Sequence, residues 1–547
     1  MNVRRYQKWA KSGLAILLAG AMMVGTAASG GGMTAQAAET ESSDTVSTQK
    51  AVTSDAASLL FTEKHITSDL TLPTIGASGT TISWKSSNPS VLSNEGKVTR
   101  PKKGAADEEV TLKGTVKMGD YAKARNFTFV VLAESEMGPT KEFALDQVEL
   151  LDDYYLTAQN SDIEFLKKFD NDRLLSRFRE TAGLDTKKIA PYGGWEDGWL
   201  GGHSVGHYLT AIAQAVKATG NADLKEKSKQ LIEGLAECQN KLGTGFIFGA
   251  KIETEGYVEK QFDILEGKTT GKTWVPWYNM HKMLTGLVDT YKYTGNKQAL
   301  EVAKKLGDWI YNRVSKWDAG TQGRVLGTEY GGMNDCLYEL YLCTRDSKHL
   351  EAAHKFDQPN LYKTVAKGGK NCLNGKHANT TIPKFLGALK RYVVLEQTGE
   401  LTKDDEAYLT NVEKFFDIAV TRHAYITGGV SVMEHFRKDN NQDGTRTQTN
   451  CESCCAHNML KMAKELYKVT GDKKYADYYE TTLRNSIMGA VKSESGAAAY
   501  FIPMATGYFK TFGNEDPAKN MFWCCTGSGM ENFTKLGDSI YFHCQMS

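Results

Sequence analysis

The chain of 547 residues lacks an excess of charge of either sign, a high cysteine content and, beyond residue 30, any apolar run of transmembrane length. Lys and Arg number 66 against 65 Asp and Glu, a formal net charge of +1, which excludes a strongly basic nucleic-acid-binding protein. Ten cysteines are too few for a disulfide-dense scaffold. With 41% hydrophobic residues the chain is not disordered, and its length allows several domains, or one large toroid with an appendage.

The N-terminus has the pattern of a secretory signal peptide. Four basic residues within 4–11 precede an apolar run over 14–28, and small residues follow up to a cleavage site near Ala37. We therefore expect residues 1–37 to be a signal peptide and the mature protein to be secreted, either free or associated with the cell surface. The alternative is an uncleaved membrane anchor, although the apolar run is short for a span of ~20 residues.

Two further segments precede the main domain. Residues 38–52 are rich in Ser, Thr, Glu and Ala, a composition that predicts a linker. Residues 53–135 alternate between apolar and polar in short runs separated by turn formers, which predicts a small all-β sandwich. The stretch Ile-Ser-Trp-Lys-Ser-Ser-Asn-Pro-Ser-Val at 82–91 resembles bacterial Ig-like modules. Such modules space or dock a catalytic domain.

From residue 142 onward the pattern is helical, with one recurring stop signal. Thr-Gly followed by Asn, Asp or Glu ends an amphipathic stretch at residues 219, 294, 398 and 470, with a Thr-Arg-Asp variant at 344. The residue after Thr supplies a left-handed helix end, and the next residue starts a new helix. This repetition predicts stacked helical hairpins, which either close into an (α/α)6 toroid or form an open solenoid. We favour the toroid because glycines and aromatic residues cluster in the connecting loops, as a pocket rim requires.

Half of the cysteines fall in two clusters. These are Cys451/Cys454/Cys455 and Cys524/Cys525. Together with Glu452, two residues before Cys454, the clusters can supply one oxygen and three sulfurs to a tetrahedral zinc ion. Zinc would also hold a thiol as the nucleophilic thiolate near neutral pH. Disulfides and buried thiol pairs are the alternatives.

Six motifs then occur in order between about residues 142 and 543. They are Gly-His-Ser-Val-Gly-His at 202–207, Trp-Tyr-Asn-Met-His-Lys at 277–282, Gly-Gly-Met-Asn at 331–334, Leu-Asn-Gly-Lys-His-Ala-Asn-Thr at 373–380, the Cys-Glu-Ser-Cys block from 451 with Asn-Met-Leu-Lys at 458–461, and Phe-Trp-Cys-Cys-Thr-Gly-Ser-Gly-Met-Glu-Asn at 522–532. Together they resemble the β-L-arabinofuranosidase family of (α/α)6 glycoside hydrolases (family 127). The resemblance implies a catalytic domain over 142–547, without the β-sandwich modules that typically follow the toroid in that family.

The resemblance also implies roles for individual residues. Cys524 matches a cysteine nucleophile, and Glu434, in the Gly-Val-Ser-Val-Met-Glu-His-Phe element at 429–436, matches the acid/base. His377 matches a histidine that contacts the sugar. The implied zinc ligands are Glu452, Cys454, Cys524 and Cys525. Retaining hydrolysis would then run through a thioglycosyl intermediate on Cys524, with Glu434 first protonating the leaving oxygen and later activating water.

Four more residues are weaker candidates for contacts with the sugar. His203 and His207 share one helix face and are expected to line the pocket or the core; the Glu of a zincin motif is absent between them. His281, near two aromatic residues, lies where a sugar subsite would be, with packing as the alternative. Glu329 could bind a sugar hydroxyl or stabilise a helix N-terminus.

The sequence thus predicts a mainly α protein, an (α/α)6 toroid preceded by a small all-β Ig-like sandwich, that is a secreted retaining glycoside hydrolase. Its expected substrates are β-L-arabinofuranosyl groups on plant glycans or glycoproteins, and its expected cofactor is Zn2+. Two alternatives stand beside it. One is a hydrolase or lyase of another sugar with a structural zinc, and the other is a non-catalytic carbohydrate-binding surface protein.

Overall fold

The structure is a computed structural model that describes residues 43–61, 64–66, 69–102, 105–133, 140–250, 257–512 and 521–544. The signal peptide predicted over 1–37 lies outside these ranges. Within them, every helix is too short or too polar to cross a membrane. The chain forms two compact units, which are described one at a time.

The smaller unit combines helix α1 (Ser43–Ser58) with residues 73–83 and 114–125. A linker was expected up to residue 52, whereas the structure is helical from Ser43. The reason is an apolar face that the Ser- and Thr-rich composition hides, because Val52 and Ala56 are buried one turn apart.

Strands β1 to β4 form one four-stranded sheet in the order β1-β4-β3-β2. Their bounds are His65–Ile66, Thr81–Ser86, Glu108–Met118 and Tyr121–Val131. In β3 Val110 and Leu112 are buried and Thr111 between them is not, so alternate side chains face a small core that also contains Phe129. The predicted small β module is thus present as one four-stranded sheet.

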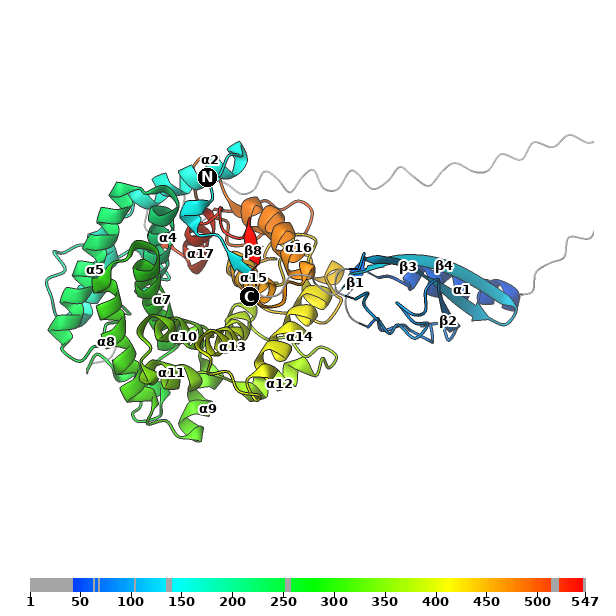
Figure 1. Cartoon of the computed structure of the whole chain (residues 1–547), viewed down its shortest axis with the longest axis horizontal. Helices are drawn as coiled ribbons and strands as arrows, with labels where there is room; N and C mark the ends of the chain where they lie inside the picture. The colour runs from blue at the N-terminus through cyan, green and yellow to red at the C-terminus, as the bar shows by residue number, and fades with distance from the viewer. Residues whose placement is uncertain are drawn as a thin grey trace, which may run out of the picture. The chain divides into compact units, whose positions relative to one another are not determined.

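Six helices form the inner ring of the helical domain. They come in chain order around the ring, with other helices between them in the sequence (Figure 1). They are α4 (His203–Thr219), α7 (Pro276–Thr294), α10 (Met333–Thr344), α13 (Ala378–Thr398), α15 (Ser453–Thr470) and α17 (Cys524–Thr534). Each packs against the next, and α17 packs against α4. The ring is therefore closed, which confirms the toroid and excludes the open solenoid.

An outer helix packs against each inner one. These are α5 (Ala222–Leu242), α8 (Lys297–Val314), α11 (Ser347–His354), α14 (Glu406–His423), α16 (Lys473–Thr482) and, against α17, α2 (Asp153–Lys167). Four further helices are α3 (Asn171–Ala182), α6 (Lys260–Leu265), α9 (Ala319–Thr328) and α12 (Pro359–Ala366). Short helical turns occur at Leu145–Gln147, Asp443–Thr445, Leu483–Ile487 and Met488–Ala490.

The predicted stop signals end five of the six inner helices. Gly220, Gly295, Arg345, Gly399 and Gly471 all have left-handed backbone at these ends. The next residue caps the following helix in four cases. The exception is Glu400, because α14 begins only at Glu406.

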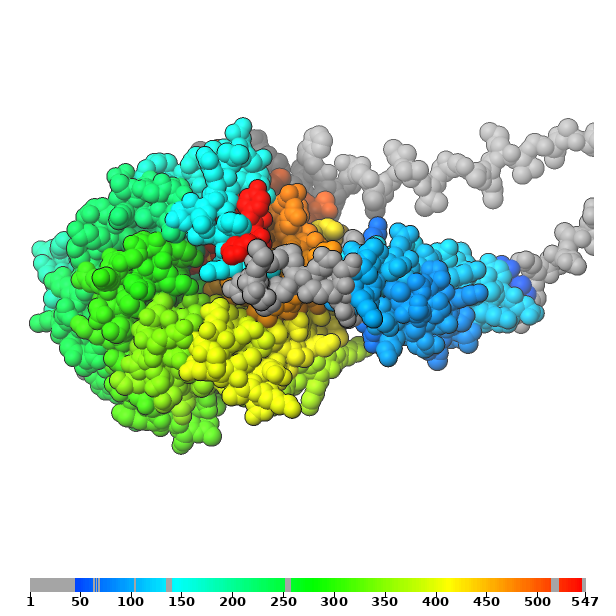
Figure 2. Space-filling model, in the orientation of Figure 1, coloured from blue at the N-terminus to red at the C-terminus, as the bar shows by residue number. Residues whose placement is uncertain are grey.

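Two short strand pairs hold the last inner helix in place. Strand β5 (Thr140–Glu142) pairs antiparallel with β8 (Phe542–Cys544). Figure 2 shows β8 in red beside the cyan residues around β5. Strand β6 (Gly193–Gly194) pairs in parallel with β7 (Met521–Phe522), two residues before Cys524. The second pair thereby fixes the segment that leads into α17.

Candidate functional site

Several of the predicted functional residues lie at the N-terminal ends of inner helices. His203 and Cys524 are the first residues of α4 and α17, whereas His377 and Glu452 are the N-caps of α13 and α15. The helix ends meet, since the rings of His203 and Phe522 are 5.7 Å apart. Free N–H groups and the positive ends of helix dipoles favour anions at such a place.

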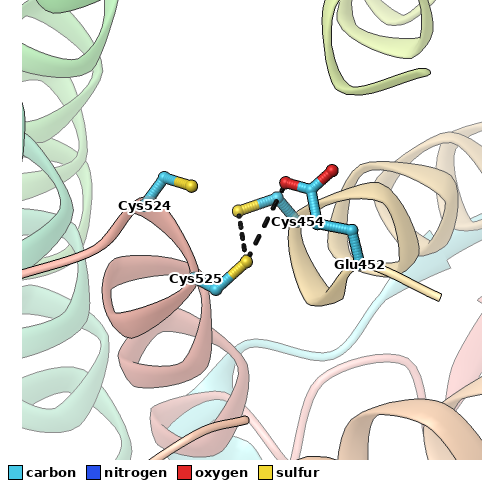
Figure 3. A group of neighbouring side chains, drawn as sticks. All are labelled: Glu452, Cys454, Cys524 and Cys525. Carbon is cyan, nitrogen blue, oxygen red and sulfur yellow. Dashed lines mark hydrogen bonds between the residues drawn. The ribbon is translucent and has the colours of Figure 1, made fainter. Parts of the chain in front are cut away.

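Four acidic and thiol side chains form a buried cluster at these ends (Figure 3). A carboxylate oxygen of Glu452 and the Sγ atoms of Cys454, Cys524 and Cys525 all lie within 4.8 Å of one another. The thiols are free, and the Sγ atoms of Cys454 and Cys525 are 3.3 Å apart. One oxygen and three sulfurs at this spacing can hold a tetrahedral metal ion, so the residues predicted as metal ligands do come together.

The Glu452 carboxylate is held from both sides. Asn379 Nδ2 donates to Oε1 at 3.0 Å, and Cys455 Sγ donates to Oε2 at 3.1 Å. Asn458 Nδ2 in turn donates to Asn379 Oδ1 at 3.2 Å. Full burial raises the pKa of Glu452. Cys455 is thus a hydrogen-bond partner of the cluster, and Asn379, inside a motif that the sequence had singled out only for His377, is a second.

The three thiols differ in acidity. Hydrogen bonds from Cys454 and Cys525, and then from Tyr500, hold the pKa of Cys524 well below its usual range. Burial raises the pKa of Cys454 and of Cys525. Cys524 is therefore the thiol that ionises first, which suits a nucleophile.

Glu434 lies on a strained turn that faces the thiols. Met433 and Glu434 both have left-handed backbone, with φ of 46° and 64°. The Glu434 Oε2 atom is 3.0 Å from His377 Nε2. Because the Thr380 N–H donates to His377 Nδ1 at 3.1 Å, the ring proton is on Nε2 and is donated to Glu434. The Glu434 side chain is 29% exposed, so it is open to a ligand.

Tyr500 connects the carboxylate to the thiol. Its hydroxyl donates to Glu434 Oε1 and lies 3.3 Å from Cys524 Sγ. Two bonds from Ser453 position it, one from its N–H to the Tyr500 carbonyl (3.0 Å) and one from its hydroxyl to Ala499. Sequence reasoning missed Tyr500, since its surroundings, Ala-Ala-Ala-Tyr-Phe at 497–501, carry no chemical pattern.

His203 belongs to the wall of this site. Its Nδ1 atom is 2.6 Å from Glu196 Oε1, and Nε2 has no hydrogen-bond partner among the described residues. The His203 ring is one of the groups that lower the pKa of Cys524. Glu196 also accepts from the N–H groups of Gly202 and Ser204, so it caps α4 as well as orienting His203.

His207 and His281 line a small cavity of about 20 Å³ together with His457 and Glu531. Glu531 is hydrogen-bonded to His207 Nδ1, and burial lowers the pKa of His207 to about 4. Trp277, which made His281 a candidate, is fully buried and packs in the aromatic core. The His207 ring is 6.1 Å from that of His203, and the His281 ring is 5.3 Å from that of Tyr278. Both histidines thus line this cavity and also lie close to residues at the N-terminal ends of α4 and α7.

Glu329 stabilises a helix start. Its Oε1 accepts from the N–H of Trp277 at 3.1 Å, at the beginning of α7. Burial raises the pKa of Glu329 to about 8. Of the two predicted roles, the geometry supports the one at the helix N-terminus, through this hydrogen bond to a free N–H group.

Comparisons with known proteins agree with this geometry. Residues 147–538 match the family model described as beta-L-arabinofuranosidase, GH127 catalytic domain, and residues 46–134 match the atrophied bacterial Ig domain. The second match begins within α1, which places this helix in the module and not in a linker. A search of curated proteins found no match.

Solved structures share the fold. One GH127 β-arabinofuranosidase is 18% identical with a TM-score of 0.56, over 74% of this chain and 63% of that one. A GH127 β-L-arabinofuranosidase from Geobacillus stearothermophilus T6 is 16% identical with a TM-score of 0.52, over 71% and 65%. The chain thus spans less than two thirds of the length of these structures.

Proposed function

The chain belongs to glycoside hydrolase family 127, and on this premise we propose that it is a retaining β-L-arabinofuranosidase with Cys524 as nucleophile and Glu434 as acid/base. The observation that carries the proposal is the contact of one hydroxyl, that of Tyr500, with both groups. The proposed substrates of this enzyme are arabinofuranosyl groups on plant glycans or glycoproteins.

The spacing of the two reacting groups supports retention. One of the two Tyr500 contacts is 3.3 Å long and the other is shorter. These contacts place Cys524 Sγ and Glu434 Oε1 at or below the lower end of the ~6.5–9.5 Å that separates the two carboxyl groups of inverting enzymes, which need room for a water molecule. A nucleophile this near the acid can reach the anomeric carbon directly.

The reaction has two steps. First, the Cys524 thiolate attacks the anomeric carbon and forms a C–S bond, while the C–O bond to the leaving group breaks and Glu434 gives its proton to that oxygen. Next, Glu434 takes a proton from water, the water oxygen bonds to the anomeric carbon, and the C–S bond breaks to return the thiolate. His377 Nε2–H and the Tyr500 hydroxyl stabilise the ionised Glu434 between the two steps.

We further propose that Glu452, Cys454, Cys524 and Cys525 hold Zn2+, for which the buried donor set is suited. When bound, the ion supplies positive charge that keeps its thiol ligands ionised near neutral pH. Asn379 and Cys455 orient the Glu452 carboxylate within the cluster.

We also propose that the protein is secreted. This rests on the basic, apolar and small-residue segments of residues 1–37. Free thiols in an oxidising compartment need protection, and Cys454, Cys524 and Cys525 are almost completely buried.

Hydrolysis of a β-L-arabinofuranosyl disaccharide, followed by NMR, tests the proposal. The wild type should release arabinose first as the β anomer, Cys524→Ser should lose at least ~10³-fold in kcat, and elemental analysis should give about one zinc per chain. Cys343→Ser is the matched control, because this thiol lies in α10 away from the cluster. Release of the α anomer first, or an active Cys524→Ser protein, would refute the mechanism.

A further inference from the structure

A row of aromatic side chains forms a second connection between the thiols and Glu434. We call Trp195, Trp274 and Tyr330 the aromatic row. Trp195 packs against the thiols of Cys454, Cys524 and Cys525. Its ring centroid is 6.2 Å from that of Trp274, which is 6.5 Å from that of Tyr330. Tyr330 lies 5.1 Å from the His377 ring, which holds Glu434.

The two ends of the aromatic row are fixed. The Trp195 N–H donates to the Phe522 carbonyl at 3.1 Å next to the β6–β7 pair, and its ring meets Trp523 edge to face at 5.6 Å. Tyr330 packs edge to face against Tyr278 at 5.3 Å. The middle member differs, because 37% of Trp274 is exposed. A large apolar side chain is thus left partly uncovered between two packed neighbours, Trp195 and Tyr330.

We propose that Trp274 and Tyr330 bind the leaving group, and that this group is a second sugar ring. The inference rests on the proposed function. Glu434 must lie within ~2.6–3.2 Å of the glycosidic oxygen to protonate it, so the leaving group begins beside Glu434. From there the rings of His377, Tyr330 and Trp274 follow one another. A methyl group is too small to cover this path, whereas a sugar ring is large enough.

The chemistry of the surface fits a sugar. An aromatic ring offers a flat face with negative charge density, and a sugar ring offers C–H groups on one face and hydroxyls at its edge. Stacking places the C–H face on Trp274 and leaves the hydroxyls in water. Such rigid aromatic contacts orient a ligand at little entropic cost.

Two substrates with the same arabinofuranosyl group test the inference, an arabinofuranosyl disaccharide and methyl β-L-arabinofuranoside. For Trp274→Ala we expect kcat/KM on the disaccharide to fall ~10-fold, through KM, and kcat/KM on the methyl glycoside to stay within twofold. Trp274→Phe should recover part of the loss. Tyr154→Ala removes an exposed aromatic side chain on α2 and should leave kcat/KM unchanged on both substrates.

The outcomes are distinguishable. An equal loss on both substrates, or no loss on either, overturns the role of Trp274 and leaves the glycosidase mechanism intact. If the wild type hydrolyses neither glycoside, the proposed function itself fails, and this inference fails with it. Circular dichroism of Trp274→Ala confirms that a selective loss is not unfolding.

Discussion

The free energy of unfolding should depend on pH because the carboxyl of Glu329 is buried. This side chain is 1% exposed, and burial raises its pKa from 4.5 to about 8. Because the folded state holds the proton more tightly than the unfolded state, the group contributes its full stabilisation below about pH 4.5 and loses it as the pH rises through 8. At 1.36 kcal/mol per pH unit, the loss is at most about 5 kcal/mol.

Glu329→Gln isolates this contribution. The amide oxygen can still accept from the N–H of Trp277, but the side chain cannot ionise. We expect the two proteins to be similarly stable near pH 4.5, and the variant to be more stable at pH 8 by up to about 5 kcal/mol.

Urea unfolding followed by tryptophan fluorescence, at pH 5, 6, 7 and 8, measures the difference. Glu301→Gln is the control, because Glu301 is exposed on α8 and paired with Lys304. Its free energy of unfolding should follow the wild type at every pH. If the wild type and Glu329→Gln differ by a constant amount across this range, the burial argument is wrong.

Three further predictions concern the site. Glu434→Gln should lower kcat/KM on methyl β-L-arabinofuranoside by ~10²–10⁴-fold. The loss should be much smaller on a nitrophenyl glycoside, because its leaving group needs no proton. Equal losses on the two substrates would argue against an acid role for Glu434. Removing metal with a strong chelator should lower the melting temperature, and added Zn2+ should restore it, since the ion binds the folded state; an unchanged melting temperature would count against the metal site. Asn379→Ala should weaken zinc binding ~10–100-fold in chelator competition. The control Asn360→Ala, at an exposed position of α12, should not weaken it. Equal zinc affinities of the two variants would contradict the role of Asn379.

Most of the fold could be predicted from local sequence patterns. The stop signals reflect one backbone requirement, a left-handed helix end, and they therefore identified the ends of five inner helices. Helix α1 was not predicted because its buried positions are few and lie among Ser and Thr. Closure of the ring depends on α17 meeting α4, a contact between distant segments that periodicity does not encode.

The residues of the site could likewise be predicted only where a local sequence pattern marks them. The Glu-x-Cys and Cys-Cys patterns are short and chemically specific, so the cluster of Glu452 and three thiols could be predicted. Tyr500 and Trp274 act through position alone, set by loops packed from elsewhere in the chain. His281 follows Tyr278 by three residues, nearly one helical turn, and this places it ~5 Å further along α7, in the lining of the cavity that it shares with His207.

Closure of the ring by α17 also sets the order in which the site can appear during synthesis. Cys525 follows Glu452 by 73 residues. A ribosome that adds ~5–20 residues per second needs about 4–15 s to make this stretch. During that time α15 can dock on α13 with its carboxylate and the thiol of Cys454 in place, while Cys524, the proposed nucleophile, has not yet been made. Cys524 therefore joins a scaffold whose other five inner helices have already been made.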